Sequence, residues 1–229
     1  NRDIARAGAG KEITVERLSE IFLGLQEKGA ANINLVTPTH YTPEIVRAVS
    51  GARDSGLTLP VVYNCGGYEK TETLRTLEGI VDIYLTDFKY MDAEAAQRYS
   101  HAPDYPEIVK EALGEMARQQ PDPVFDEKGM MRKGVIVRHL LLPRHLKNAE
   151  AVVKYVYETY GNRVYLSLMN QYTPLPGMED WPELNRRVTK REYGRLLDYA
   201  VELGVENGFI QEGGTAEESF IPAFDNEGV

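Results

Sequence analysis

The chain has 229 residues, with 26 lysines and arginines against 35 aspartates and glutamates, which gives a formal net charge of −9. This length suits a single α/β barrel domain, and an acidic chain without a basic block is a poor candidate for a nucleic-acid-binding protein. One cysteine excludes an internal disulfide framework, and neither a membrane-spanning apolar run nor a signal peptide is visible. We therefore expect a protein of a reducing, cytoplasmic compartment.

The spacing of apolar residues predicts helices and strands in alternation along the chain. A first helix is expected at 14–28, and it should follow a strand that this chain lacks. Asn148 is expected to cap one later helix, and Thr189 with Glu192 to form a capping box on another. These later helices are expected at residues 43–55, 70–78, 92–99, 106–119, 148–160 and 189–203. Strands are expected at residues 32–36, 59–63, 82–86, 134–142, 163–168 and 207–210, with a polar insertion at 120–133.

The expected strands are too apolar to face water on either side, which indicates a parallel sheet covered by helices. A partial (β/α)6 barrel is the natural closure, and a doubly wound open sheet is the alternative. No linker divides the chain, so we expect a single domain over residues 1–229. Within it, residues 213–229 form a Gly- and acid-rich tail that either covers the open side of the barrel or hangs loose.

Polar residues follow most of the expected strands. In parallel α/β folds the active site gathers at the carboxyl ends of the strands, so these residues are candidates for one shared site. Arg138 joins them because an arginine within an apolar strand is costly unless paired. Its neighbour His139 points to the opposite face and is expected to be a satisfied core residue. The other candidates are Thr37, Pro38, Thr39, His40, Asn64, Cys65, Gly66, Gly67, Asp87, Lys89, Asn170, Gln171 and Tyr172.

Asp87 and Lys89 lie two residues apart at the tip of a buried strand and therefore point the same way. They are consistent with a structural ion pair at the barrel mouth. Lys89 could also bind an anionic ligand, or act as a Schiff-base nucleophile. Cys65, taken alone, has the properties of an inert core residue. The residues by themselves leave these alternatives open.

Six stretches of the sequence together carry a family resemblance. They are "INLVTPTHYTPEIV", "VVYNCGGYE", "VDIYLTDFKYMD", "VIVRHLLLP", "SLMNQYTP" and "GFIQEGGTAEESFIPAFD". In combination they resemble radical S-adenosylmethionine (SAM) proteins, in the subgroup similar to pyruvate formate-lyase activating enzymes. The resemblance covers nearly the whole chain, in the right order, and its specificity comes from the combination.

The resemblance implies a partial (β/α)6 barrel and a 4Fe–4S cluster held by three cysteines of a CxxxCxxC loop. The cluster would receive one electron from a donor and cleave SAM to a 5′-deoxyadenosyl radical, as in an oxidoreductase. The substrate would be a glycyl-radical partner enzyme or a small molecule, with no nucleic acid and no membrane involved.

The resemblance also implies a set of SAM-binding positions. Thr37, Thr39 and His40 occupy the place of a Gly-Gly-Glu segment that binds the SAM amino group. Asn64, Cys65 and Gly66 match a segment near the ribose and carboxylate. Asp87 and Lys89 match an Asp-x-Lys motif whose lysine reaches the SAM carboxylate. Arg138 resembles a further polar group over the cofactor, and Asn170, Gln171 and Tyr172 match a segment near the adenine and ribose.

The chain departs from this pattern in two places. The CxxxCxxC loop is absent, and the lone Cys65 cannot replace three ligands. We therefore expect this chain, which looks like a C-terminal fragment, to bind no cluster and to be inactive by itself. The Gly-Gly-Glu segment is also replaced by Thr-Pro-Thr-His. Two other functions stay open, a barrel lyase or aldolase that uses Lys89 and a binding scaffold without a cluster.

Overall fold

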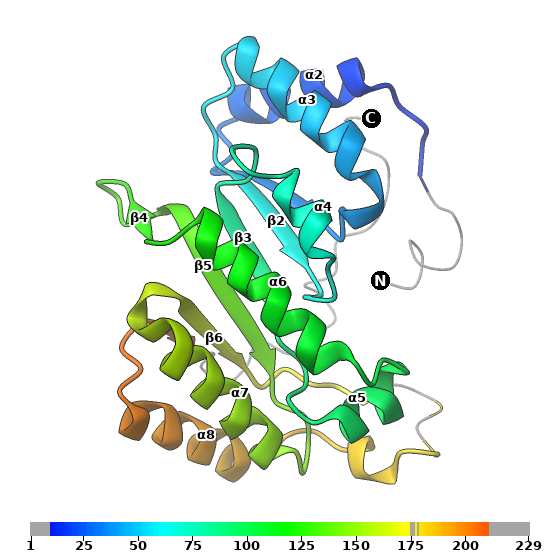
Figure 1. Ribbon diagram of the computed structural model, residues 1–229, viewed down its shortest axis with the longest axis vertical. Helices are drawn as coiled ribbons and strands as arrows, with labels where there is room; N and C mark the ends of the chain where they lie inside the picture. The colour runs from blue at the N-terminus through cyan, green and yellow to red at the C-terminus, as the bar shows by residue number, and fades with distance from the viewer. Residues whose placement is uncertain (1–9, 175–176, 178, 211–229) are drawn as a thin grey trace.

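A seven-stranded sheet forms the centre of the protein (Figure 1). The computed structural model describes residues 10–174, 177 and 179–210 of the chain. The strands are β1 (Ile33–Val36), β2 (Val61–Cys65), β3 (Ile83–Asp87), β4 (Val124–Phe125), β5 (Met131–Leu140), β6 (Tyr165–Met169) and β7 (Gly208–Ile210). The helices are α2 (Val15–Glu27), α3 (Thr42–Asp54), α4 (Thr71–Arg75), α5 (Ala93–Ser100), α6 (Tyr105–Gln119), α7 (Leu146–Tyr160) and α8 (Lys190–Leu203). Short 3-10 turns lie at Thr39–Tyr41, Gly161–Arg163 and Pro182–Leu184.

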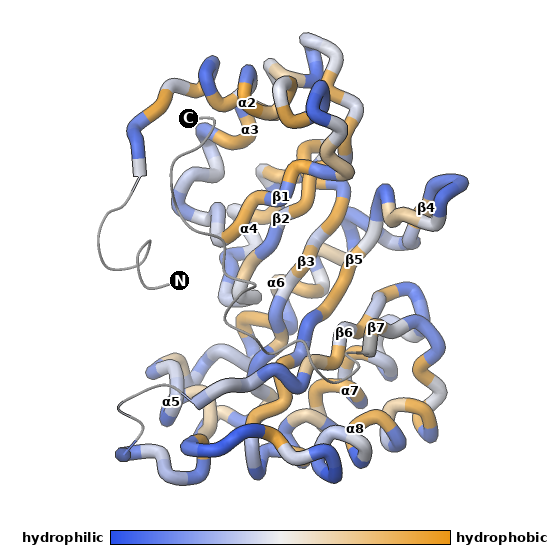
Figure 2. The backbone as a smooth tube through the Cα atoms, turned by 180° about the vertical axis from the view of Figure 1, so that it is seen from behind, coloured by the Kyte–Doolittle hydropathy of each residue, from blue (hydrophilic) through white to orange (hydrophobic). Residues whose placement is uncertain are grey.

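The strands follow one another across the sheet in chain order, β1-β2-β3-β5-β6-β7, and all these neighbours are parallel. Right-handed crossovers that always step in the same direction place their helices on one face of the sheet. Figure 1 shows α6 and α7 in front of the sheet, and Figure 2 shows β3 and β5 in front of α6. The expected barrel-type fold is confirmed, and the doubly wound alternative is wrong because the strand order never reverses. In the described residues the sheet is open, with β1 and β7 at its ends.

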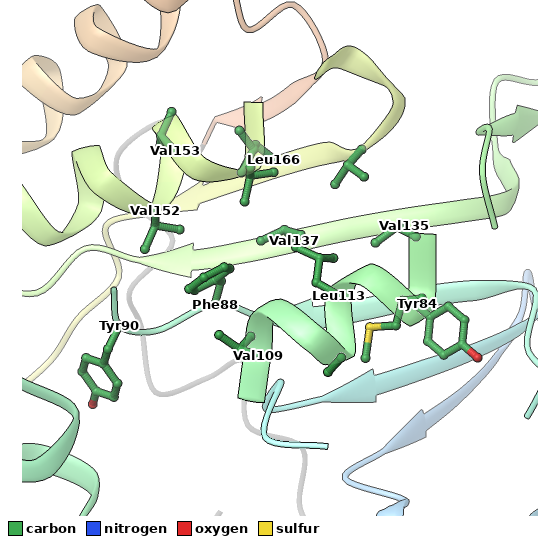
Figure 3. Close-up of a cluster of buried hydrophobic side chains, with 14 of the residues drawn as sticks. Tyr84, Phe88, Tyr90, Val109, Leu113, Val135, Val137, Val152, Val153 and Leu166 are labelled. Atoms are coloured by element: carbon green, nitrogen blue, oxygen red, sulfur yellow. The ribbon is translucent and has the colours of Figure 1, made fainter. Parts of the chain in front are cut away.

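The two faces of the sheet differ in burial. On the helix face, side chains such as Tyr84, Val135 and Val137 are fully buried against α6 and α7 (Figure 3). On the other face, alternate residues such as Leu85, Ile136 and Leu140 are only half-buried. We call this second face the open face. A second core, which includes Phe22, Ile45, Val49 and Val61, packs α2 and α3 against the first strands.

Several expected boundaries are corrected by the structure. The second strand ends at Cys65 rather than at residue 63, so Asn64 and Cys65 belong to β2. The polar insertion forms a hairpin, in which β4 pairs antiparallel with the start of β5. Asn148 is not an N-cap, because α7 begins earlier, at Leu146. Thr189 and Glu192 do form the expected capping box on α8.

No helix in the described residues is long and apolar enough to span a bilayer.

Candidate functional site

Asp87, Arg138 and Asn64 form a polar network on the open face. Asp87 ends β3 and is the direct cross-strand neighbour of Arg138 on β5. The Arg138 Nε and Nη2 atoms lie 2.9 and 2.8 Å from Asp87 Oδ1, and Nη2 also donates to Asn64 Oδ1 at 2.7 Å. Each of the two charged side chains is 24% exposed. The cost of placing Arg138 within an apolar strand is thus offset by an acceptor from the adjacent β3 and another from β2, one strand further on.

Lys89 lies beside this network and is more exposed. Its Nζ is 3.9 Å from Asp87 Oδ2, and its side chain is 47% exposed. A Schiff-base lysine is activated by desolvation or by a neighbouring cation, whereas Lys89 is half-exposed and pairs with a carboxylate. The geometry therefore favours Lys89 as an anion-binding group over Lys89 as a nucleophile.

The loops after β2 and β3 touch each other, and this contact fixes the position of Lys89. A Cβ on Gly67, whose φ is +79°, would lie 2.2 Å from the Asp87 carbonyl oxygen, so the close approach requires glycine. A Cβ on Gly66 would lie 3.7 Å from Lys89 Nζ. The Tyr105 hydroxyl of α6 accepts from the Lys89 N–H at 2.9 Å and lies 3.0 Å from the carbonyl oxygens of Gly66 and Asp87. Burial raises the pKa of Tyr105, so it keeps its proton for this bridge.

Asn148 holds the same loop from the other side. Its Nδ2 donates to the Lys89 carbonyl oxygen at 3.0 Å, and its Oδ1 accepts from the N–H groups of Met91 and Asp92 at 2.8 and 3.2 Å. The backbone around Lys89 is therefore fixed by Tyr105 and Asn148, while its side chain is left accessible.

The turn after β1 contacts a buried carboxylate that sequence reasoning missed, Glu69 in the loop after β2. Thr37 has a φ of 51°, and its N–H donates to the Asn64 carbonyl oxygen at 2.8 Å. Thr39 Oγ1 donates to Glu69 Oε1 at 2.7 Å, and the Tyr63 hydroxyl lies 3.4 Å from Glu69 Oε2. Glu69 is 5% exposed, and burial raises its pKa. The signal was available, because Glu69 ends the quoted stretch "VVYNCGGYE".

The remaining candidate residues lie in different environments. His40 is exposed and stacks at a tilt on Tyr41. Cys65 faces the helix side of β2, where its Sγ lies 3.5 Å from Thr86 Oγ1 and burial raises its pKa to about 11. The Tyr172 hydroxyl donates to the Leu184 carbonyl oxygen at 3.0 Å. Asn170 and Gln171 follow β6 at the same end of the sheet, half-buried and exposed respectively.

His139 is a core residue, as expected, but only one of its two ring nitrogens has a hydrogen-bond partner among the described residues. Its Nδ1 lies 2.7 Å from the Phe88 carbonyl oxygen and therefore carries the proton. Its Nε2 has no hydrogen-bond partner among the described residues. Burial lowers the pKa of His139, which keeps the ring neutral.

The residues present do not fit an iron–sulfur cluster. The sequence contains one cysteine, and that cysteine is buried and bonded to a hydroxyl. In the described part of the chain no three His, Cys, Asp or Glu side chains gather as a metal site. The open-face network, by contrast, presents the Lys89 cation and the Asn64 amide to a small polar ligand.

No protein-family model matches the chain. The uncharacterized protein MJ0674 of Methanocaldococcus jannaschii is 30% identical over 178 residues, which cover 76% of this chain and 47% of that protein. The chain thus spans about half the length of the curated relative it matches.

Solved structures of two proteins share the fold. A domain of a pyruvate-formate lyase-activating enzyme from Bacteroides vulgatus matches with a TM-score of 0.56 and 12% identity, over 80% of this chain and all of that domain. Streptococcus suis SuiB bound to S-adenosylmethionine matches with a TM-score of 0.58 and 11% identity, over 89% of this chain and 44% of SuiB. SuiB bound to its precursor peptide SuiA gives the same TM-score at 10% identity. The similarity to radical SAM proteins that the sequence indicated is therefore confirmed at the level of the fold.

Proposed function

We propose that this chain is the SAM-binding part of a radical SAM enzyme. The observation that carries the proposal is the presentation of Lys89, whose backbone is held by Tyr105 and Asn148 while its side chain stays 47% exposed. A fixed, accessible cation at the carboxyl end of a central strand suits a carboxylate ligand. The fold similarity to SuiB, which binds S-adenosylmethionine, supports the same ligand.

In this proposal each end of SAM meets a different part of the rim. Lys89 pairs with the methionyl carboxylate, and Asp87 and Arg138 hold Lys89 and Asn64 in place. The turn at Thr37, Thr39 and His40 lies where the amino group would bind. Gly66 leaves room beside Lys89 Nζ. Asn170, Gln171 and Tyr172 contact the adenine and ribose, and Cys65 contributes through its backbone.

The redox chemistry is proposed for the intact protein. A 4Fe–4S cluster bound by three cysteines outside this chain would supply the electron that cleaves SAM, and this chain alone is expected to be inactive. The substrate class is a protein or a small molecule. An activating enzyme and an enzyme bound to its precursor peptide share the fold, which supports a glycyl-radical partner or another polypeptide. We further propose that residues 1–229 form one domain and that the protein is cytoplasmic. The tail at 213–229 lies outside the described residues.

The first test is SAM binding by the chain, measured by isothermal titration calorimetry under reducing conditions. Lys89→Gln should weaken the affinity about tenfold, because a charge-assisted hydrogen bond to a carboxylate is lost. The matched control is Lys70→Gln, which removes an exposed lysine just after the β2 loop and should leave the affinity unchanged. Equal binding by the two variants would contradict the proposed role of Lys89.

Two further measurements test the chemistry. Anaerobic reconstitution with iron and sulfide should load no cluster on this chain, and a loaded cluster would contradict the proposal. The intact protein, reduced under anaerobic conditions, should release 5′-deoxyadenosine from SAM. Borohydride trapping of a carbonyl substrate at Lys89 would instead support a lyase.

A further inference from the structure

A cavity of about 630 Å³ lies outside the network just described. It opens between the loop after β3, the start of α7 and one face of α8. Its walls include Met91, Asp92, Arg144, Lys147, Asn148 and Arg195. Asn148 also holds the Lys89 loop, so one wall of the cavity is hydrogen-bonded to the backbone of the loop after β3.

The cavity concentrates positive charge on an acidic protein. Arg144 lies in the loop before α7, Lys147 in α7 and Arg195 in α8. Their side chains are exposed and form no ion pair within the described residues. Of the two carboxylates in the walls, Asp92 is occupied as the N-cap of α5, where it accepts from the Glu94 N–H at 2.9 Å. Asp92 keeps its negative charge there, so the three cations exceed the carboxylates of Asp92 and Glu150 by one charge. The whole chain has a net charge of −9, so this local excess is not a consequence of composition.

The backbone at the start of α7 adds to the positive electrostatic potential of the cavity. The first turn of α7 contains no acidic residue, and its N-cap residue, His145, forms no capping hydrogen bond. The His145 ring is instead held by the Tyr99 hydroxyl, 3.0 Å from Nε2, and Tyr99 donates to Glu183 Oε1 at 2.7 Å. The positive end of the helix dipole therefore faces a cavity that already holds three unpaired cations.

We propose that this cavity binds the phosphate group of a small anionic ligand. Guanidinium and ammonium groups are the side chains that recognise phosphate, and three of them suit a ligand with two or more negative charges. The volume matches a small-molecule site. Met91, Leu146 and Ala151 supply an apolar wall for the remainder of the ligand. The site is separate from the proposed SAM site and does not depend on it.

The test is calorimetric binding of inorganic pyrophosphate, of AMP and of a glutamate-rich peptide at constant ionic strength. Lys147→Gln and Arg195→Gln should each weaken pyrophosphate binding about tenfold, and Glu150→Gln should strengthen it severalfold because it removes the opposing charge. The matched control is Lys128→Gln, an exposed lysine in the β4–β5 turn, which should bind like the unaltered chain. Circular dichroism checks that each variant is folded.

Each outcome decides the proposal. The proposal is supported if pyrophosphate and AMP both bind, more weakly to the Lys147 and Arg195 variants and more tightly to the Glu150 variant. Tighter binding of AMP than of pyrophosphate would show that the apolar wall contributes. Pyrophosphate that binds no better than chloride, or Lys147 and Arg195 variants that behave like Lys128→Gln, would overturn it. Binding of the acidic peptide without pyrophosphate binding would overturn it in favour of an acidic protein partner.

Discussion

Arg138 and His139 are neighbours on β5 and face opposite sides of the sheet. His139 is 1% exposed, neutral and bonded only to a backbone carbonyl. Arg138 is partly exposed and pairs with a carboxylate from β3 and an amide from β2. The helix face of the sheet is thus a dry core in which His139 stays neutral, whereas the open face gathers charged and polar groups into a site. Both residues are polar, so the degree of burial, rather than the residue type, distinguishes the structural His139 from the candidate site residue Arg138.

The largest expected effect comes from the contact that joins the β2 and β3 loops. Gly67→Ala places a Cβ 2.2 Å from the Asp87 carbonyl oxygen at a φ of +79°. We expect it to lower the free energy of unfolding by about 3 kcal/mol, because a backbone contact has no side-chain freedom to relax. Gly79→Ala is the matched control, with a φ of +76° and nothing within 4 Å, and should cost about 1 kcal/mol. Chemical denaturation measures both, and equal losses would contradict the close-contact argument.

The next effect tests whether the open-face network also stabilises the fold. Arg138→Ala removes the guanidinium group that donates to the Asp87 carboxylate and to the side-chain oxygen of Asn64. We expect a loss of about 2 kcal/mol in the free energy of unfolding, since water can replace only part of these bonds. Arg47→Ala, which breaks a surface pair with Glu44, is the control and should cost about 0.5 kcal/mol or less. If both substitutions cost the same, the network is a surface feature only.

The pH dependence of stability reports on the dry face. His139 has a lowered pKa in the folded protein because it is buried. Below about pH 6.5 the unfolded chain binds a proton at this residue that the folded chain does not bind. Stability should therefore fall with decreasing pH, by up to about 1.4 kcal/mol per pH unit.

The matched variant for this effect is His139→Asn, which keeps a donor towards the Phe88 carbonyl oxygen but does not titrate. Its denaturation free energy should depend less on pH between 7.5 and 5.5 than that of the unaltered chain. A residual slope is expected from His145, whose pKa burial also lowers. Identical slopes for the two proteins would show that His139 is not the group responsible.

The sequence predicted the helices and strands of this fold better than their exact ends and the side-chain contacts between them. Apolar runs identified each parallel strand, and the capping box at Thr189 fixed the start of α8. The β2 strand was placed two residues early because Asn64 and Cys65 interrupt the apolar run while still lying in the strand. Asn148 was misread as an N-cap because its side chain serves a loop more than fifty residues away. Such partners depend on tertiary contacts that local patterns do not encode.

The candidate site shows the same limit. The sequence indicated that Asp87, Lys89 and Arg138 lie at one rim, because alternate residues on parallel strands face one way. It did not indicate that Asp87 pairs more closely with Arg138 than with Lys89, which follows from the cross-strand register. It also missed Tyr105, whose hydroxyl bridges three backbone groups from a helix start that carries no distinguishing motif.

The smallest expected effect on stability separates Lys89 from Arg138. The Lys89 Nζ is 3.9 Å from Asp87 and its side chain is 47% exposed, so the pair is weak and solvated. Lys89→Gln should change the free energy of unfolding by about 0.5 kcal/mol or less, in contrast to Arg138→Ala. A loss as large as that of Arg138→Ala would make Lys89 a structural residue. A small loss combined with weakened SAM binding would mean that the open face holds one cation for the fold and a second for the ligand.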